Sequence, residues 1–326
     1  MQPTAKASTG TAADGPAPRI AAAICTYNRH DLLALAIDSC LAQDMALSDY
    51  EIIVVDNSPD HAAAAQFGEA YKDRPNLTYM VEKTPGLSNA RNVAARHTRA
   101  DVIAYLDDDA IAKPNWLREL VRAFESFGPS AMIAGGKISP IWDVPRPAWL
   151  GDSKLGHVSV VDWGGATRVI KRNEWIAGAN ISFRRAPLLQ IGGFDTELGR
   201  KGPESSLLSN EETDVLRKLS DLGGLALYVP EAEVDHLVDR RRLDQMWFRR
   251  RSAWQAVSDS INDPTVDGWA ADAMDNALEY LLRQPPRYRS VAGFNRPLED
   301  PEDFEAQLDA IYNYTIAMLS GFKGKP

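Results

Sequence analysis

An apolar segment that ends abruptly in three carboxylates constrains the fold of this chain most. The residues from Val102 to Leu106 are apolar or aromatic, and Asp107, Asp108 and Asp109 follow them directly. Short apolar runs that contain Val, Ile and Tyr are typical of buried strands in a parallel sheet. Open α/β sheets bind their ligands at the carboxyl ends of such strands. We therefore expect the three carboxylates to lie at the edge of a ligand-binding crevice.

Three adjacent negative charges repel one another, so a positive group should share their site. A hard divalent cation prefers oxygen ligands and can also bind a diphosphate, and it meets this requirement. A solvated acidic loop is the alternative. The Asp run taken alone does not distinguish between the two.

Strand-like and helix-like segments alternate through roughly the first 110 residues. The expected strands are residues 19–26, 50–55, 77–81 and 102–106. Helix-like segments separate them, and Asp31 is the expected cap of the first helix. This order predicts right-handed βαβ units and a parallel sheet. No Gly-x-Gly-x-x-Gly follows the first strand, which argues against a dinucleotide-binding domain of the hydride-transfer type.

Polar residues at two strand ends could still bind a nucleotide. Thr26 and Asn28 follow the first strand, and Asp56 follows the second. A carboxylate can accept a hydrogen bond from an imide N–H, which uracil and thymine possess and cytosine lacks. Asp56 therefore favours a uridine or thymidine nucleotide.

The composition changes after a helix expected at residues 113–127, which Pro114 opens. Residues 128–175 contain several Gly and Pro and four of the eight tryptophans, which predicts a short-stranded extension that covers the sheet. Trp175 could be a platform for a sugar ring, because Trp combines a large apolar face with an N–H group. Packing of a loop-rich region is the alternative role for any one of these tryptophans.

The second half of the chain contains a further set of functional candidates. Gly178 lies in a predicted strand, 175–185, where a ligand could approach the backbone. Residues 198–208 could form a mobile loop. Ser209 to Glu212 matches a capping box before a helix that extends to about residue 222. A strand is expected at 225–229, and Arg triplets at 240–242 and 249–251 flank a probable helical segment.

Overall composition excludes some classes of protein. The chain has 326 residues, of which 44% are hydrophobic and 25% charged, as in ordinary globular proteins. Its formal net charge of −9 argues against a nucleic-acid partner, because the phosphate backbone would be repelled. No apolar run approaches the ~18 residues that a membrane span needs.

The ends and the cysteines add expectations about location. Residues 1–18 are rich in Ala, Thr, Gly and Pro without an apolar core, so we expect a disordered tail and no secretory signal. Cys25 and Cys40 form neither a disulfide framework nor a metal-binding spacing, which favours the cytoplasm.

Eight short motifs occur in one order along the chain: Cys25–Arg29, Val54–Ser58, Gly86–Asn92, Leu106–Asp109, Gly178–Asn180, Gly192–Asp195, Asn210–Glu212 and Val234–His236. This ordered set resembles the inverting family 2 glycosyltransferases of the GT-A fold, of bacterial type, over roughly residues 19–255. The resemblance implies an α/β fold with a Rossmann-like, mostly parallel sheet flanked by helices. We expect a tail at 1–18, a GT-A domain at 19–260 and a C-terminal helical extension at 261–326. The domain would comprise a nucleotide-binding half, about 19–112, and an acceptor-side half, about 113–260.

The resemblance also implies a function and a set of site residues. The expected activity is metal-dependent, inverting transfer of a sugar from a UDP- or dTDP-linked donor to a hydroxyl acceptor in glycan, polysaccharide or glycolipid assembly. The implied donor-binding residues are Thr26, Asn28, Arg29, Asp56, Arg91, Asp107, Asp108, Gly178 and Asn180. The implied ligands of Mn²⁺ or Mg²⁺ are Asp107, Asp109 and His236. Glu212 matches the catalytic base, and Trp175, Arg249 and Arg250 are candidates for phosphate or acceptor contacts.

The chain departs from the family pattern at the base. Many relatives carry Asp after the Glu, whereas this chain has Glu211 followed by Glu212. The departure leaves open which of the two is the base.

Two other classes stay open at this point, a sugar nucleotidyltransferase and a non-catalytic module that binds nucleotide-sugars. The expected acceptor is a glycan or a lipid-linked sugar. The basic residues 240–251 could instead attach the chain to anionic lipid, at the inner face of the membrane.

Overall fold

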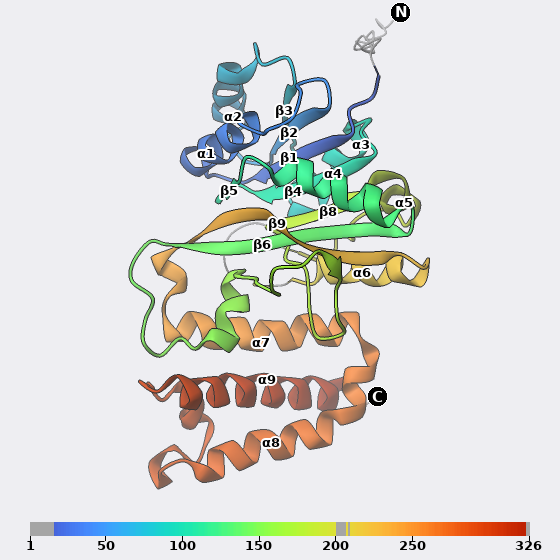
Figure 1. Ribbon diagram of the computed structural model, residues 1–326. Coiled ribbons are helices and arrows are strands. Elements are labelled where there is room, and N and C mark those ends of the chain that lie inside the picture. Colours follow the sequence, from blue (N-terminus) through green and yellow to red (C-terminus); the bar gives the residue numbers. More distant parts are fainter. Residues whose placement is uncertain (1–15, 200–206, 208, 324–326) are drawn as a thin grey trace, which may run out of the picture.

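The computed structural model describes residues 16–199, 207 and 209–323, and within them a nine-stranded sheet carries helices on both faces (Figure 1). The α/β fold class predicted from the sequence is confirmed. Most of the expected tail, residues 1–15, lies outside the described residues, as do residues 200–206 and 208 of the expected mobile loop.

The first part of the sheet is parallel, as predicted. Its strands lie in the order β3 (Leu77–Val81), β2 (Tyr50–Asp56), β1 (Ile20–Thr26) and β4 (Val102–Asp107). The connecting helices are α1 (His30–Leu41), α2 (His61–Gly68) and α3 (Leu87–His97). The prediction that Asp31 caps α1 is wrong, because the helix already begins at His30 and Asp31 lies in its first turn.

The second part of the sheet is mixed, so the sheet as a whole is less parallel than predicted. After β4 follow β8 (Asn180–Arg184), β6 (Ala131–Trp142), β9 (Leu225–Val238) and β5 (Ala110–Ala112), with β7 (Arg168–Val169) paired to β9. Strand β8 is antiparallel to both β4 and β6, whereas β6 and β9 are parallel.

Strands β6 and β9 were not recognised in the sequence at their full length. The short-stranded extension predicted for 128–175 instead begins with the 12-residue strand β6, and β9 runs through 14 residues where a strand at 225–229 was expected. Gly136 and Pro230 conceal this pattern, because both residue types normally weaken a strand. The structure accommodates them at a register shift between Gly136 and Ile138.

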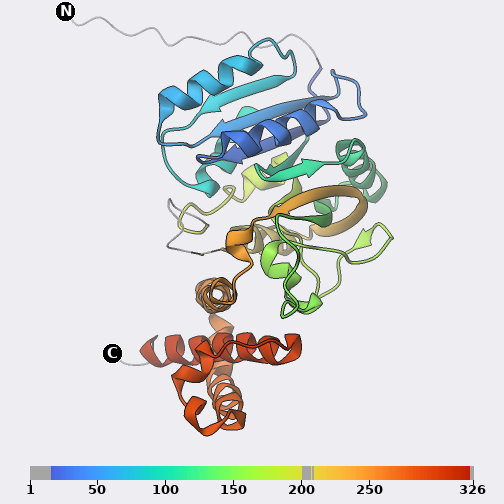
Figure 2. The same cartoon turned by 90° about the vertical axis from the view of Figure 1, so that its left-hand side faces the viewer.

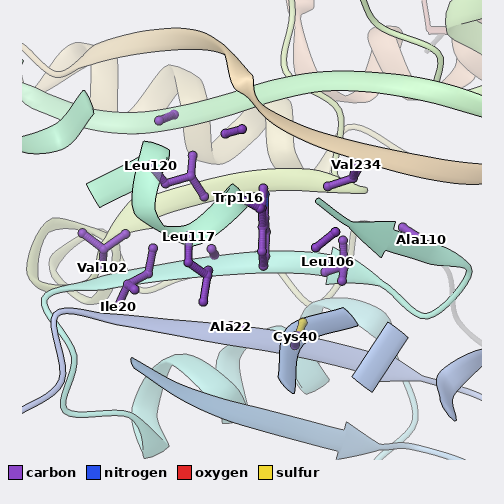
Figure 3. Close-up of a cluster of buried hydrophobic side chains, with 14 of the residues drawn as sticks. Ile20, Ala22, Cys40, Val102, Leu106, Ala110, Trp116, Leu117, Leu120 and Val234 are labelled. Carbon is purple, nitrogen blue, oxygen red and sulfur yellow. The ribbon is translucent and has the colours of Figure 1, made fainter. Parts of the chain in front are cut away.

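Side chains alternate between the two faces of the sheet along β1. Ile20, Ala22 and Ile24 pack with α1 and with α4 (Trp116–Phe127) on one face. Ala21 and Ala23 pack on the other face with α3, α5 (Arg185–Gln190) and α6 (Glu211–Asp221). Figure 3 shows the first of these clusters, with side chains of α4 among those of β1 and β4. Strands covered on both faces need apolar residues at every position, which explains the continuous apolar runs in the sequence.

Helix α4 begins later than predicted. Residues 110–112 form β5, and Lys113 N donates to Glu233 O of β9 at 3.0 Å. Asn115 Nδ2 donates to Glu231 O at 2.9 Å. The segment before Trp116 is therefore held to β9, and the helix expected from residue 113 begins only at Trp116.

Three long helices form the C-terminal part, below the sheet in Figure 1 and set apart from it in Figure 2. They are α7 (Gln245–Asn262), α8 (Ala270–Arg283) and α9 (Pro301–Lys323), and the predicted break at Pro285–Pro286 separates the last two. Helix α7 packs on α9, where Ser252 Oγ donates to Leu308 O at 2.7 Å. The helical extension predicted from residue 261 thus packs with a helix that begins at Gln245.

Short 3-10 helices complete the described elements, at Glu69–Tyr71, Asp152–Val158, Arg240–Arg242, Pro264–Trp269, Pro286–Tyr288 and Val291–Asn295. In the part of the chain that the structure describes, no helix combines the length and apolar composition of a transmembrane segment.

The close approach of β6 to β9 predicts a strong requirement for glycine at position 136. A Cβ atom there would lie 1.8 Å from the backbone oxygen of Ala232, which cannot move without disturbing β9. We expect Gly136→Ala to lower the free energy of unfolding by about 1–3 kcal/mol or more, the usual range for overpacking. Gly151→Ala is the control, because its Cβ would make only an ordinary contact with Pro301, at 3.5 Å. Equal urea midpoints for the two variants would contradict this prediction.

Candidate active site

A short strand pairing brings His236 to the Asp run. Asp107 ends β4, and the turn that follows leads into β5, where Ala110 pairs with His236 of β9. Leu237 N also donates to Asp109 O at 2.9 Å. As a result, one ligand atom each from Asp107, Asp109 and His236 lie within 4.8 Å of one another. The three predicted metal ligands, which are distant in the sequence, are therefore neighbours.

The chemistry of this trio fits a divalent cation. Two carboxylates supply hard oxygen ligands, and an imidazole suits Mn²⁺ better than Mg²⁺. His236 is 1% exposed, and its Nδ1 is buried without a hydrogen-bond partner in the described part of the chain. Its Nε2 lies 3.1 Å from Asp109 Oδ1. The buried imidazole thus lies beside the Asp109 carboxylate, and with Asp107 these side chains could hold a metal ion.

Two arginines contact the same carboxylates. Arg29 Nη1 donates to Asp109 Oδ2 at 2.8 Å and to Asp108 Oδ1 at 3.2 Å. Arg242 Nη2 lies 3.8 Å from Asp109 Oδ2. Arg29 is one of the predicted donor residues, and Arg242 belongs to the basic stretch 240–251, of which the sequence prediction named Arg249 and Arg250 for phosphate or acceptor contacts. Guanidinium groups in this position could bind a diphosphate.

The surroundings of the cluster shift the pKa values of Asp108 and Asp109 in opposite directions. Burial and the neighbouring charge of Asp109 raise the pKa of Asp108 to about 6, although Arg29 and the hydroxyl of Thr26 oppose this shift. Thr26 Oγ1 donates to Asp108 Oδ2 at 2.7 Å. Burial alone would also raise the pKa of Asp109, but the charges around it lower that pKa below its ordinary value. Those charges belong to His236, Arg242 and Arg29.

A buried arginine connects the Asp run to the two glutamates. Arg91 Nη1 donates to Glu212 Oε1 at 2.8 Å and to Glu211 Oε1 at 3.3 Å. Its Nη2 lies 3.8 Å from Asp107 Oδ1. Arg91 is 2% exposed, and its guanidinium packs over the ring of Phe194 at 5.2 Å. The predicted donor residue, the predicted base and one predicted metal ligand thus form a continuous network.

The glutamates do not form the predicted capping box. Helix α6 begins at Glu211 with Asn210 as its N-cap, so Ser209 is not the cap. Glu212 instead pairs with Arg91, and its side chain is 18% exposed compared with 5% for Glu211. Of the two, Glu212 is therefore the more accessible to an acceptor.

Gly178 faces these groups directly. A Cβ atom at this position would lie 1.8 Å from Glu212 Oε1 and 2.7 Å from Arg91 Nη2. The sequence prediction placed Gly178 beside the donor sugar, and the structure brings it to the Arg91 network. Trp175, three residues earlier, is 42% exposed and packs edge-on against Trp163, with ring centroids 4.6 Å apart.

The expected base-binding residues lie together at the ends of β1 and β2. Asp56 is fully buried, and its carboxylate oxygens accept from Tyr79 Oη at 2.6 Å and from Ser58 N at 2.9 Å. His30 Nε2 lies 2.7 Å from Asp56 Oδ2. Burial alone would raise the pKa of Asp56, but these hydrogen bonds outweigh it and lower the pKa. Asn28 N donates to Ser58 Oγ at 2.9 Å. A base that pairs with Asp56 must therefore replace or share one of these donors.

The structure does not bring Asn180 to the site, which corrects the prediction for its side chain. Asn180 lies on the face of β8 that packs against α4, where its Oδ1 accepts from Trp116 Nε1 at 2.8 Å. Its Nδ2 donates to Ala232 O at 2.8 Å and to Lys137 O at 3.2 Å. The side chain is 1% exposed and holds the sheet to a helix.

Arg249 is likewise remote from the cluster. Its Nε donates to Gln307 Oε1 at 2.8 Å, and its Nη2 donates to Gln245 Oε1 at 2.9 Å and Arg296 O at 2.8 Å. The side chain is buried between the C-terminal helices, which corrects the prediction that it contacts phosphate or the acceptor. Arg250 is exposed on the same helix.

The fold is that of the GT-A glycosyltransferases. Solved structures with the same fold include a mannosyltransferase from Pyrobaculum calidifontis in complex with GDP-Man and Mn²⁺, with a TM-score of 0.57 at 19% identity. That match covers 95% of this chain and 89% of the other. GalNAc-T7 with UDP, GalNAc and Mn²⁺ has a TM-score of 0.51 at 16% identity, over 74% of this chain and 51% of the other.

The sequence comparisons then indicate a family. Residues 22–153 match the model described as glycosyl transferase family 2. A glucosyl-dolichyl phosphate glucuronosyltransferase of Haloferax volcanii is 28% identical over 93% of this chain and 95% of its own length. A validoxylamine A glucosyltransferase of Streptomyces hygroscopicus is 24% identical over 57% of this chain, which spans 49% of that relative. Over residues 22–153 the chain is thus similar to the family 2 glycosyltransferases, and the names of its relatives support a glycosyltransferase.

The contact between Gly178 and Glu212 predicts a selective loss of activity. In Gly178→Ala the new methyl group must displace the Glu212 carboxylate from Arg91. We expect turnover to fall by about 10-fold to 100-fold, the order expected when a side chain at an active site is displaced, while uridine diphosphate still binds. Gly165→Ala is the control, because no atom lies within 4 Å of its added Cβ. Isothermal titration and a diphosphate-release assay measure the two properties, and equal turnover in both variants would contradict the prediction.

Proposed function

We propose that this enzyme transfers a sugar, with inversion, from a UDP- or dTDP-linked donor to a hydroxyl group, and that the reaction depends on a divalent metal. One observation carries the proposal. Asp107 and Glu212 contact different nitrogens of the same buried guanidinium, at 3.8 and 2.8 Å. A ligand of the metal that would bind the leaving diphosphate and a group that can accept the acceptor's proton are therefore held on either side of Arg91.

The residues of the chain then have distinct roles. Asp107, Asp109 and His236 would hold Mn²⁺ or Mg²⁺, which when bound supplies a Lewis acid for the diphosphate. Arg29 and Arg242 bind the phosphate oxygens. Glu212 accepts the proton of the acceptor hydroxyl as the new bond forms, a contribution that is typically about 10²–10⁴-fold in rate.

The donor base and the acceptor are proposed on separate grounds. Thr26, Asn28 and Asp56 would bind the nucleoside, and Asp56 supports a base with an imide N–H. A lipid-linked acceptor is supported by the name of the Haloferax relative, a glucosyl-dolichyl phosphate glucuronosyltransferase that aligns along 93% of the chain. A cytoplasmic enzyme at the inner face of the membrane would meet such an acceptor, and the exposed Arg250 could contribute to membrane contact.

Thermal-shift screening of UDP-, dTDP- and GDP-linked sugars with Mn²⁺ tests the donor, and strongest stabilisation by a GDP-sugar would overturn the base assignment.

The charges around Asp109 predict that metal and diphosphate bind together. A divalent cation beside Arg29 and Arg242 adds positive charge, which the diphosphate then neutralises. We expect uridine diphosphate to bind at least about tenfold more tightly with Mn²⁺ than with EDTA, a difference of about 1.4 kcal/mol. Uridine, which carries no phosphate, is the control and should bind equally in both. Equal affinity of the diphosphate in both solutions would remove the metal from donor binding.

The role of Glu212 predicts a loss of chemistry without a loss of binding. Glu212→Gln keeps the size of the side chain but cannot accept a proton at neutral pH. We expect donor affinity to remain near that of the wild type and transfer to slow by at least about a hundredfold. Glu211→Gln is the matched comparison, because Glu211 contacts the same arginine but is more buried. If Glu211→Gln instead shows the larger loss, Glu211 is the base.

A further inference from the structure

The first turn of α6, which carries both glutamates, starts from a residue with unusual backbone geometry. Asn210 has φ of +80°, and among the described residues only Asn28 and Ser159 also combine a positive φ with a side chain. The left-handed conformation disfavours residues other than Gly, although Asn tolerates it better than most. Neighbouring groups must therefore hold Asn210 in this geometry.

These neighbouring groups come from the C-terminal helices. Asn210 Nδ2 donates to Asp259 Oδ1 of α7 at 2.7 Å, and Gln255 Nε2 donates to Asn210 Oδ1 at 3.1 Å. Asn262 Nδ2 donates to Asn210 O at 3.4 Å. Three side chains of one helix thus bind the side chain and the backbone of the N-cap residue, which is 8% exposed.

A tyrosine of α9 extends this network. Tyr312 Oη donates to Asp259 Oδ2 at 2.8 Å, so both carboxylate oxygens of Asp259 are hydrogen bonded. Burial and the charge of Asp259 raise the pKa of Tyr312, which keeps the phenol protonated as a donor. The chain of contacts from α9 through α7 to α6 consists of short hydrogen bonds between partly buried groups.

An open pocket of about 540 Å³ lies at this junction, lined by residues of α6, α7, α9 and the segment before α8. Asn210, Asp259 and Tyr312 are all among its lining residues. The hydrogen bonds from α7 hold the Asn210 side chain at the edge of this pocket.

We propose that Asn210, Asp259 and Tyr312 are positioning residues, through which the C-terminal helices orient Glu212 toward the acceptor. Asp214 N donates to Asn210 O at 3.0 Å, so a rotation of Asn210 is transmitted to the first turn of α6. Misplacement of a catalytic group by about 1 Å can cost up to about 10²-fold in rate. This inference rests on the proposed role of Glu212, and it assigns a function to helices that lie outside the matched region 22–153.

The test compares two Tyr-to-Phe variants in α9. Tyr312→Phe removes the hydroxyl that binds Asp259, whereas Tyr314→Phe, the control, alters a ring that packs on Phe294. The activity measured is nucleoside diphosphate release, with water as acceptor, from whichever of UDP-glucose, UDP-glucuronate, UDP-GalNAc and GDP-mannose is cleaved fastest. We expect Tyr312→Phe to lower kcat by about tenfold, within the range for misplaced groups, with an unchanged KM and melting temperature. Tyr314→Phe should match the wild type.

A second pair of variants separates side-chain hydrogen bonds from backbone geometry. Asn210→Gly accepts the positive φ but loses the bonds to Asp259 and Gln255, and we expect the same fall in kcat as for Tyr312→Phe. Asn210→Asp should be slower still, because it places a second carboxylate against Asp259.

Hydrogen–deuterium exchange of residues 209–222 provides a readout that does not depend on activity, and it should be faster in Tyr312→Phe than in Tyr314→Phe.

The double variant Glu212→Gln, Tyr312→Phe shows whether Tyr312 acts through Glu212. If it does, the double variant is no slower than Glu212→Gln alone, because effects that share one group are not additive. Independent, multiplicative losses would overturn the positioning role. Full activity of Glu212→Gln would overturn the proposed base itself. A slow Glu212→Gln together with a wild-type Tyr312→Phe, in both kcat and exchange, would overturn only the inference about the C-terminal helices.

Discussion

The buried guanidinium of Arg91 is the interaction on which the arrangement of the site depends. It lies against Glu211, Glu212 and Asp107, and it is itself 2% exposed. The desolvation of a buried charge is costly, and removal of one partner from a buried ion pair leaves the other uncompensated. The carboxylates from α6 and β4 lie around this cation, and their charges compensate for its burial.

On the opposite side of the site, carboxylates are also compensated by cations, but these cations come from other elements of the fold. Asp108 and Asp109 are compensated by Arg29 from the loop after β1 and, for Asp109, by Arg242 and His236 from the end of β9. Among the described residues of the site, the carboxylates of Asp107, Asp108, Asp109, Glu211 and Glu212 outnumber the guanidinium groups of Arg29, Arg91 and Arg242. A site of this kind is suited to a ligand that brings both a cation and a diphosphate, since the two additions largely cancel in charge.

The mixed part of the sheet explains how distant residues reach this site. Strand β8 reverses the direction of the sheet beside β4, and β6 and β9 then extend it toward β5. The long strand β9 places His236 beside the Asp run. The chain then continues to α7, which contacts Asn210, the N-cap of α6. The C-terminal helices are attached through the end of β9, through Asn210 and through the ion pair of Lys154 with Asp309 of α9.

The sequence by itself determined the local elements and the residue types of the site. The apolar runs of β1, β2 and β4 identify these strands from the sequence alone, because strands covered on both faces are apolar at every position. The polar residues at their carboxyl ends follow from the same pattern, as do the metal-ligand candidates Asp107 and Asp109. His236 and Glu212 were identified by the order of the motifs along the chain.

Only the tertiary structure decided which of these residues meet. Asn180 and Gly178 are two residues apart, yet the side chain of Asn180 lies on the α4 face of the sheet while Gly178 lies against Glu212, and a motif does not show this difference. Arg242 lies close to the Asp109 carboxylate and Arg249 does not, because the position of each arginine depends on where β9 ends and α7 begins. Ser209 and Glu212 have the spacing of a capping box, but Arg91 binds Glu212 instead. Each of these outcomes depends on contacts between segments far apart in the chain, and local propensity carries no information about such contacts.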